Sequence, residues 1–322
     1  MGFYALSCRQ SAITRRQGTM QQLAVFSTSA KDGVTEAALR ALMATAGCAP
    51  DADTEICCLA DNRAYEVAVS DALTTDGAVD RMIAALRPPA DAAGIDVNIV
   101  PDTNRRKRLL IADMDSTIIT SESLDDMAVM AGLAEQVLPV TRRAMNGELD
   151  FTAALDARIA LFAGQKESLL QDALEDAVLT SGAKTLVRTM RANGGRAYLV
   201  SGGFTAITGP IAAACGFDGH HANQLELSGG VLTGRVLRPI LDRDAKARHL
   251  HHYCNEMGID ASAAAAIGDG SNDLEMLTGA GFGVAFHGKP ALRQQVQLQL
   301  NHTDLTGLLY LQGYRACEFV TG

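Results

Sequence analysis

The sequence predicts an α/β protein in two parts: a small ferredoxin-like (α+β) domain, then a larger domain with a parallel sheet and a helical cap. Two patterns support this fold class. Residues 22–100 alternate strand and helix patterns in the order β-α-β-β-α-β. From residue 108 onward, short apolar runs are each followed by a loop and a helical pattern, which is typical of a parallel α/β sheet.

The elements of the first domain follow from apolar periodicity and turn residues. Asp61-Asn62 should join two strands as a hairpin turn. The second helix should stop at Pro88-Pro89, because proline has no N–H for the helix ladder. In chain order, the expected elements are 23–26, 35–46, 55–59, 64–70, 76–86 and 95–100. Residues 1–21 are expected to form a flexible leader, 22–100 the domain itself and 101–107 a linker.

The second domain is expected to span residues 108–322. Its strands are expected at 108–112, 196–200, 263–267 and 282–286. Helical patterns fill the chain between the first two strands, and Asp150 can cap one helix at 151–163. A helical insertion there would lie over the carboxyl edge of the sheet, where such sheets bind ligands. We therefore expect a helical cap at about 121–182 that acts as a lid.

Composition excludes several classes of function. A formal charge of −9 argues against non-specific binding of nucleic acid, which needs a basic face. No apolar stretch is long enough to cross a membrane. The seven cysteines are scattered and form no C-x-x-C pair, which indicates neither a disulfide framework nor a zinc site. We expect a reducing, cytoplasmic compartment.

The first cluster of polar residues, Asp113 and Asp115, directly follows an apolar strand. Because the chain turns at a strand end, one carboxylate can face a phosphorus atom while the other faces the leaving oxygen. The first can attack phosphorus, and the second can protonate the leaving group and then deprotonate water. The alternative is a pair of exposed turn aspartates, which strand ends also carry.

Three further clusters follow later strands or open a helix. Ser201-Gly202-Gly203 can hold phosphate oxygens through a hydroxyl and backbone N–H groups, although this is also ordinary turn chemistry. Lys246 can neutralise phosphate and carboxylate charge, although a lone helical lysine is more often at the surface. The loop from Gly268 to Asp273 offers the hard oxygen ligands that Mg²⁺ prefers.

The four clusters, in this order, resemble the motifs of the haloacid dehalogenase (HAD) superfamily, and their residue sequences resemble those of its phosphoserine phosphatase branch. The resemblance covers residues 108–310. It implies a Rossmann-like core and Mg²⁺-dependent hydrolysis of O-phospho-L-serine through an aspartyl-phosphate, the last step of serine biosynthesis. One rival is another HAD small-molecule phosphatase or phosphotransferase. A second rival is a non-catalytic amino-acid sensor that acts through the ferredoxin-like domain. Such a binding module would have no need of all four residues Asp113, Asp115, Lys246 and Asp269.

The resemblance also implies roles for single residues. Asp113 matches the nucleophile and Asp115 the general acid/base. The implied Mg²⁺ ligands are Asp113, the backbone carbonyl of Asp115, and Asp269, with Asp273 near the metal. The implied phosphate binders are Ser201, Gly202 and Lys246, and Asn272 matches a substrate contact.

Substrate recognition is assigned to the lid by the same resemblance. Glu122 matches the residue that holds the substrate ammonium, Arg158 the one that holds its carboxylate, and Met145 and Phe151 the apolar contacts. The residues support this independently, because Phe151, Leu155 and Arg158 fall on one stripe of a helix. An arginine on an apolar stripe needs an anionic partner, which is either the substrate or an internal acid.

The element order of the first domain resembles that of ACT-type domains, which are small-molecule regulatory modules of amino-acid enzymes. Serine would be the first ligand to test. The alternatives are a dimerisation module, which would make the protein a homodimer through this domain, or a decayed regulatory domain. The expected partners are thus a small-molecule substrate, phosphoserine, with neither nucleic acid nor membrane.

Overall fold

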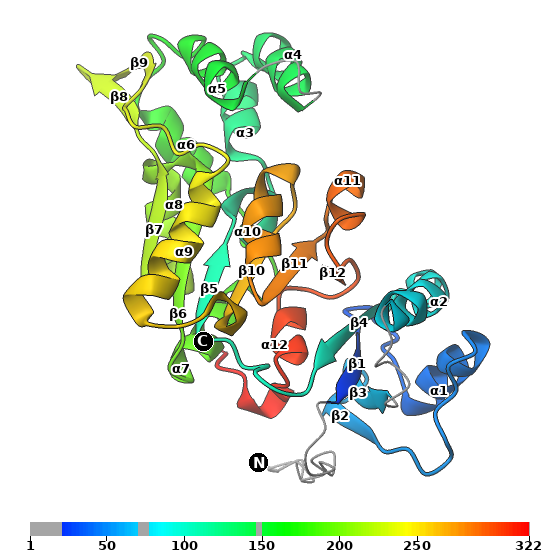
Figure 1. Cartoon of the computed structure of the whole chain (residues 1–322). Helices are drawn as coiled ribbons and strands as arrows, with labels where there is room; N and C mark the ends of the chain where they lie inside the picture. Colours follow the sequence, from blue (N-terminus) through cyan, green and yellow to red (C-terminus); the bar gives the residue numbers. More distant parts are fainter. Residues whose placement is uncertain (1–20, 70–76, 146–149, 322) are drawn as a thin grey trace, which may run out of the picture. The chain divides into compact units, whose positions relative to one another are not determined.

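The computed structural model describes residues 21–69, 77–145 and 150–321 of the chain (Figure 1). Contacts divide the chain into two compact units. The first groups the chain up to Arg106 with Leu298–Val320, and the second contains Lys107–Gln297. The leader expected at 1–21 lies almost entirely outside the described residues, as does the expected start of the second helix.

The first unit has the predicted β-α-β-β-α-β order. Its antiparallel sheet has the order β2-β3-β1-β4, with β1 pairing antiparallel to both β3 and β4. The two helices pack on a core of buried apolar residues, among which Phe26 and Leu86 are fully buried. The elements are β1 Gln22–Ser27, α1 Glu36–Thr45, β2 Ile56–Ala60, β3 Ala64–Val69, α2 Ala78–Ala92 and β4 Asp96–Pro101.

Helix α2 corrects the sequence prediction, because it continues through Pro88-Pro89 to Ala92. The carbonyl groups that these prolines leave without a backbone N–H belong to Ala84 and Ala85, and both residues are exposed. Water can therefore bond these carbonyls. Ala90, which directly follows Pro89, is fully buried, so packing of this turn stabilises the helix beyond the prolines.

The C-terminal segment, with β12 (Leu298–Leu300) and α12 (Gly307–Leu311), completes the first unit. Asp96 accepts hydrogen bonds from the backbone N–H groups of Asn301, His302 and Thr303, at 2.7, 3.0 and 2.8 Å. Asn98 exchanges two further bonds with the backbone of Gln299, each of 2.8 Å. This segment was expected in the second domain, whereas its contacts group it with the first unit.

Asp96→Ala should destabilise the first unit, because it removes the shared acceptor of three backbone N–H groups at a side chain only 3% exposed. We expect a loss of roughly 3 kcal/mol in the free energy of unfolding, measured by urea denaturation. Asp102→Ala is the matched control, because Asp102 accepts one bond of 3.2 Å from Gln21 at a half-buried site. Equal losses in both variants would contradict the role of Asp96.

The second unit is the predicted α/β domain. Within this unit the strands of the main sheet follow the order β11-β10-β5-β6-β7, and the pairs β11-β10, β10-β5, β5-β6 and β6-β7 are parallel. Figure 1 shows helices flanking these strands. The strands are β5 Leu109–Ala112, β6 Arg196–Phe204, β7 Gly219–Asn223, β10 Ala264–Gly268 and β11 Phe282–Phe286. The helices of this layer are α7 Ala183–Ala192, α8 Thr205–Cys215, α9 Ala245–Met257, α10 Leu274–Gly279 and α11 Pro290–Arg293.

In the described residues, four helices lie between β5 and α7, and a hairpin from later in the chain contacts the segment after the third of them. The helices are α3 Ser123–Met130, α4 Ala134–Met145, α5 Phe151–Ala160 and α6 Ser168–Asp176. Asp150 caps α5 as expected, with Oδ2 accepting from the N–H groups of Thr152 and Ala153. The hairpin, β8 Leu225–Ser228 and β9 Val231–Val236, was not predicted, although Gly229-Gly230 is a turn signal. Leu232 bonds the chain just after α5 through its own N–H and carbonyl groups.

Two findings bear on the compositional expectations. Within the described ranges, no helix is long and apolar enough to cross a membrane. The six cysteines of those ranges form no disulfide with one another.

Candidate active site

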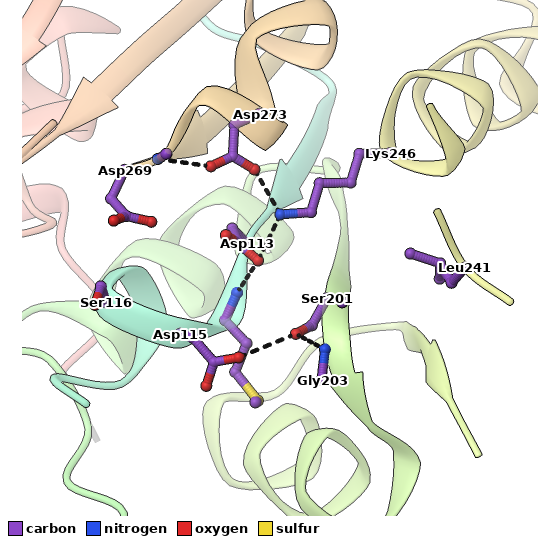
Figure 2. Close-up of polar contacts among 12 residues, drawn as sticks. Asp113, Asp115, Ser116, Ser201, Gly203, Leu241, Lys246, Asp269 and Asp273 are labelled. Atoms are coloured by element: carbon purple, nitrogen blue, oxygen red, sulfur yellow. Dashed lines mark hydrogen bonds and ion pairs between the residues drawn. The ribbon is translucent and has the colours of Figure 1, made fainter. Parts of the chain in front are cut away.

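The two aspartates of the first cluster lie at the carboxyl end of β5 and point in different directions (Figure 2). Strand β5 ends at Ala112, and the chain then turns through Ser116, whose φ of 53° lies in the left-handed region. The Ser116 N–H bonds the Ser121 carbonyl at 3.0 Å and so closes the turn. Asp113 consequently faces Lys246, and Asp115 faces Ser201.

Lys246 holds two carboxylates together in the interior. Its Nζ lies 2.7 Å from Asp113 Oδ1 and 2.6 Å from Asp273 Oδ1, and its side chain is 2% exposed. Burial lowers the pKa of Lys246, but the two carboxylates outweigh burial and hold the pKa above its usual value. Lys246 is therefore a cation fixed beside Asp113, as a charge-neutralising role requires.

Asp115 has the environment of a proton donor and acceptor. Burial, with the charge of Glu122 adding to it, raises the pKa of Asp115 to about 6, although the Ser123 N–H acts against this shift. Ser123 N donates to Asp115 Oδ1 at 3.0 Å, and Ser201 Oγ lies 3.5 Å from Oδ2. Ser201 Oγ also accepts from Gly203 N at 2.9 Å, which ties the second cluster to the first.

Three carboxylates form a group that could hold a metal ion. One oxygen from each of Asp113, Asp269 and Asp273 lies within 4.8 Å of the others, and all three residues are buried. Oxygen-only donors suit a hard divalent cation. Burial, followed by the charge of Asp273, raises the pKa of Asp113 despite Lys246, so a bound cation would offset an excess of negative charge. Asp115 was expected to bind the metal through its backbone carbonyl, and its side-chain carboxylate is not part of this group.

A cavity of about 610 Å³ opens above these carboxylates and gathers most of the expected residues. The expected residues that line it are Asp113, Asp115, Glu122, Phe151, Arg158, Gly202, Asp269 and Asn272. Ser201, Lys246 and Asp273 are buried beneath it. Met145 ends α4, and its side chain lies outside the described part of the structure.

The cap contributes the opposite wall of the cavity. Phe151 covers the second cluster, because a methyl group added to Gly202 would lie 3.4 Å from Phe151 Cζ. Arg158 is held by the Ala154 carbonyl at 3.2 Å and by Thr141 Oγ1 at 3.4 Å. In the described part of the chain no acid forms an ion pair with Arg158, so the internal partner considered from the sequence is not found there.

Sequence reasoning missed two residues at this site. Lys289, just after β11, lies 3.0 Å from Asp269 and 3.6 Å from Glu122. Asn223, at the end of β7, donates from Nδ2 to the Gly202 carbonyl at 2.9 Å and accepts from Leu241 N at 2.7 Å. Lys289 follows strand β11 and Asn223 ends strand β7. A position at the carboxyl end of a strand is the sequence signal that could have identified them.

Residues 110–278 match the family model of the haloacid dehalogenase-like hydrolases. The chain belongs to this family. Its curated relatives include phosphoserine phosphatase SerB2 of Mycobacterium tuberculosis, 42% identical over 65% of this chain and 51% of the relative. Another is the phosphoserine phosphatase of Lactococcus lactis subsp. lactis, 37% identical over 63% of this chain and 94% of the relative.

Solved HAD structures agree with the fold. A HAD family hydrolase of Salmonella enterica superimposes with a TM-score of 0.78 at 26% identity, covering 90% of this chain and 98% of that one. A substrate-bound phosphoserine phosphatase complex superimposes with a TM-score of 0.60 at 32% identity, covering 63% and 97%. The match spans little more than half the length of the relatives from M. tuberculosis and Streptomyces coelicolor, at 51% and 56%.

Lys246→Met should leave two buried carboxylates without their cation. We expect the metal-free protein to lose about 3 kcal/mol or more in free energy of unfolding, because breaking a buried pair exposes the full cost of burying the remaining charges. The measurement is urea denaturation in the presence of a chelator. Lys184→Met, at an exposed position on α7, is the control and should change little. A Lys246→Met protein as stable as this control would show that the carboxylates are not charged.

Proposed function

We propose that the chain is a phosphoserine phosphatase that hydrolyses O-phospho-L-serine to L-serine and phosphate with Mg²⁺ bound. One observation supports the proposal most strongly. A buried Asp113–Lys246 ion pair and Asp115, whose pKa burial raises to about 6, lie together at the floor of one cavity. The names of the relatives from M. tuberculosis and L. lactis support this substrate.

The reaction would proceed in two steps. An Asp113 carboxylate oxygen attacks phosphorus, the bond from phosphorus to the serine oxygen breaks, and protonated Asp115 gives its proton to that oxygen. Asp115 then takes a proton from water, which attacks the phospho-Asp113 phosphorus and releases phosphate. The Ser201 hydroxyl, the Gly202 N–H and the Lys246 ammonium would bind the phosphate oxygens that carry the charge.

Mg²⁺ would be held by Asp113, the Asp115 carbonyl and Asp269, and would offset charge on a phosphate oxygen. Asp273 holds Lys246 beside this site. Hard oxygen donors in a buried group are the basis for choosing Mg²⁺ over softer metals.

The cap would supply specificity for an α-amino acid. Glu122 would bind the ammonium group and Arg158 the carboxylate, with Phe151 and Met145 as apolar contacts and Asn272 as a contact from the core. Arg158 supports this assignment, because it lines the cavity and forms no ion pair with an acid among the described residues. Burial lowers the pKa of Arg158, and the charges of Asp125 and Glu122 act against this shift.

Asp113→Asn should abolish hydrolysis. The amide is a poor nucleophile, so we expect phosphate release from phosphoserine to fall by several orders of magnitude, measured with Mg²⁺ present. Asp172→Asn, at an exposed position on α6, is the matched control and should retain activity. A near wild-type rate for Asp113→Asn would rule out the aspartyl-phosphate route.

Arg158→Ala tests the substrate class against the rival that the chain acts on another small phosphate ester, or transfers phosphate to an alcohol. We expect kcat/KM for phosphoserine to fall about 10- to 100-fold, because a charge-assisted hydrogen bond to the carboxylate is lost. Phosphoethanolamine, which lacks that carboxylate, should be hydrolysed equally by both proteins. Equal losses on both esters would favour the rival.

Four expectations stay predictions from the sequence. These are ligand sensing by an ACT-type first domain, a homodimer formed through it, a cytoplasmic location and cap limits of about 121–182.

A further inference from the structure

Lys289 places a second ammonium group at the carboxylates of the site. Its backbone N–H bonds the Asp269 carbonyl at 2.9 Å, which fixes the start of its side chain next to the metal-binding loop. Its Nζ lies 3.0 Å from Asp269 Oδ2 and 3.6 Å from Glu122 Oε1. Glu122 Oε1 also accepts from Ser116 Oγ at 3.0 Å, so its carboxylate is held in place.

The two lysines of the site differ in how firmly they are held. Lys246 is 2% exposed, whereas the Lys289 side chain is 47% exposed and borders the cavity. Because the Lys289 side chain is half-exposed, its ammonium regains water when another cation takes its place at the carboxylates, so the exchange costs little. Its flexible four-carbon stem allows the ammonium to reach solvent while the backbone stays bonded to Asp269.

The two carboxylates that contact Lys289 are the same ones that, in the proposed function, bind Mg²⁺ and the substrate ammonium group. Asp269 is a proposed Mg²⁺ ligand, and its side chain is only 7% exposed. Glu122 is the proposed partner of the substrate ammonium. A buried carboxylate without a partner is costly, so a resident cation stabilises the site before metal and substrate arrive.

We propose that Lys289 is a displaceable counter-ion, which occupies Asp269 and Glu122 in the free enzyme and is released when Mg²⁺ and the substrate ammonium bind. This role rests on the proposed function. Because each incoming cation must replace the Lys289 ammonium, Lys289 weakens the binding of both. It thereby acts as a positioning and affinity-setting residue, outside the chemical step itself.

The test is calorimetric titration of Mg²⁺ into Lys289→Met without substrate, which measures binding independently of turnover. We expect the Mg²⁺ Kd to fall roughly three- to tenfold below the wild-type value, since about 1 kcal/mol of competing ion pair is removed. Lys289→Arg keeps the charge and should stay near the wild-type value. Lys184→Met is the matched control for loss of an exposed lysine and should also bind as the wild type does.

L-serine titrated into the Mg²⁺-loaded proteins tests the second carboxylate. Lys289→Met should bind serine more tightly than the wild type, because Glu122 is then free for the ammonium group. In a chelator, the variant should unfold at a lower temperature, and Mg²⁺ should raise its Tm by more than it raises that of the wild type.

Unchanged or weaker Mg²⁺ binding by Lys289→Met overturns the proposal, because Lys289 would then support the metal loop and would not compete with the metal. Absence of Mg²⁺ binding in the wild type overturns it as well. A wild type that binds Mg²⁺ but releases no phosphate from phosphoserine overturns the proposed function instead. The two failures are thus distinguishable.

Discussion

The contact of Lys246 with Asp113 and Asp273 is the interaction on which the site depends. Removing three charged groups from water costs several kcal/mol for each unless opposite charges meet closely, as they do here at 2.6 and 2.7 Å. The three residues come from the first turn of α9, the end of β5 and the start of α10. Their ion pairs therefore fix three separate elements at one edge of the sheet, and two carboxylates against one ammonium leave a negative charge that favours a metal ion.

Local backbone geometry divides the work between the two aspartates. A regular strand would have placed Asp113 and Asp115 on the same face. The left-handed residue Ser116 turns the chain, so that one carboxylate joins the ion-paired group and the other meets Ser201. The Asp115 pKa of about 6 then results mainly from burial, whereas Asp113 is held in an ion pair with Lys246.

The first unit shows how a domain can depend on a distant part of the chain. Asp96 and Asn98 on β4 bond residues more than 200 positions later, which carry β12 and the turn that follows it. These bonds are buried or half-buried, so losing them would leave polar groups unpaired. This unit is therefore built from two parts of the chain, and the whole second unit lies between them in the sequence.

The sequence by itself determined the element order of the first unit, four parallel strands of the main sheet, the Asp150 cap and the strand-end clusters. Each of these depends on a pattern within a few neighbouring residues. The family resemblance suggested roles for Glu122 and Arg158, and both residues line the same cavity. Only the tertiary structure decided that α2 continues through its prolines, that the C-terminal segment joins the first unit, and that Lys289 meets Asp269. Each of these depends on solvent exposure or on contacts between residues far apart in the chain, and neither quantity is encoded in local periodicity.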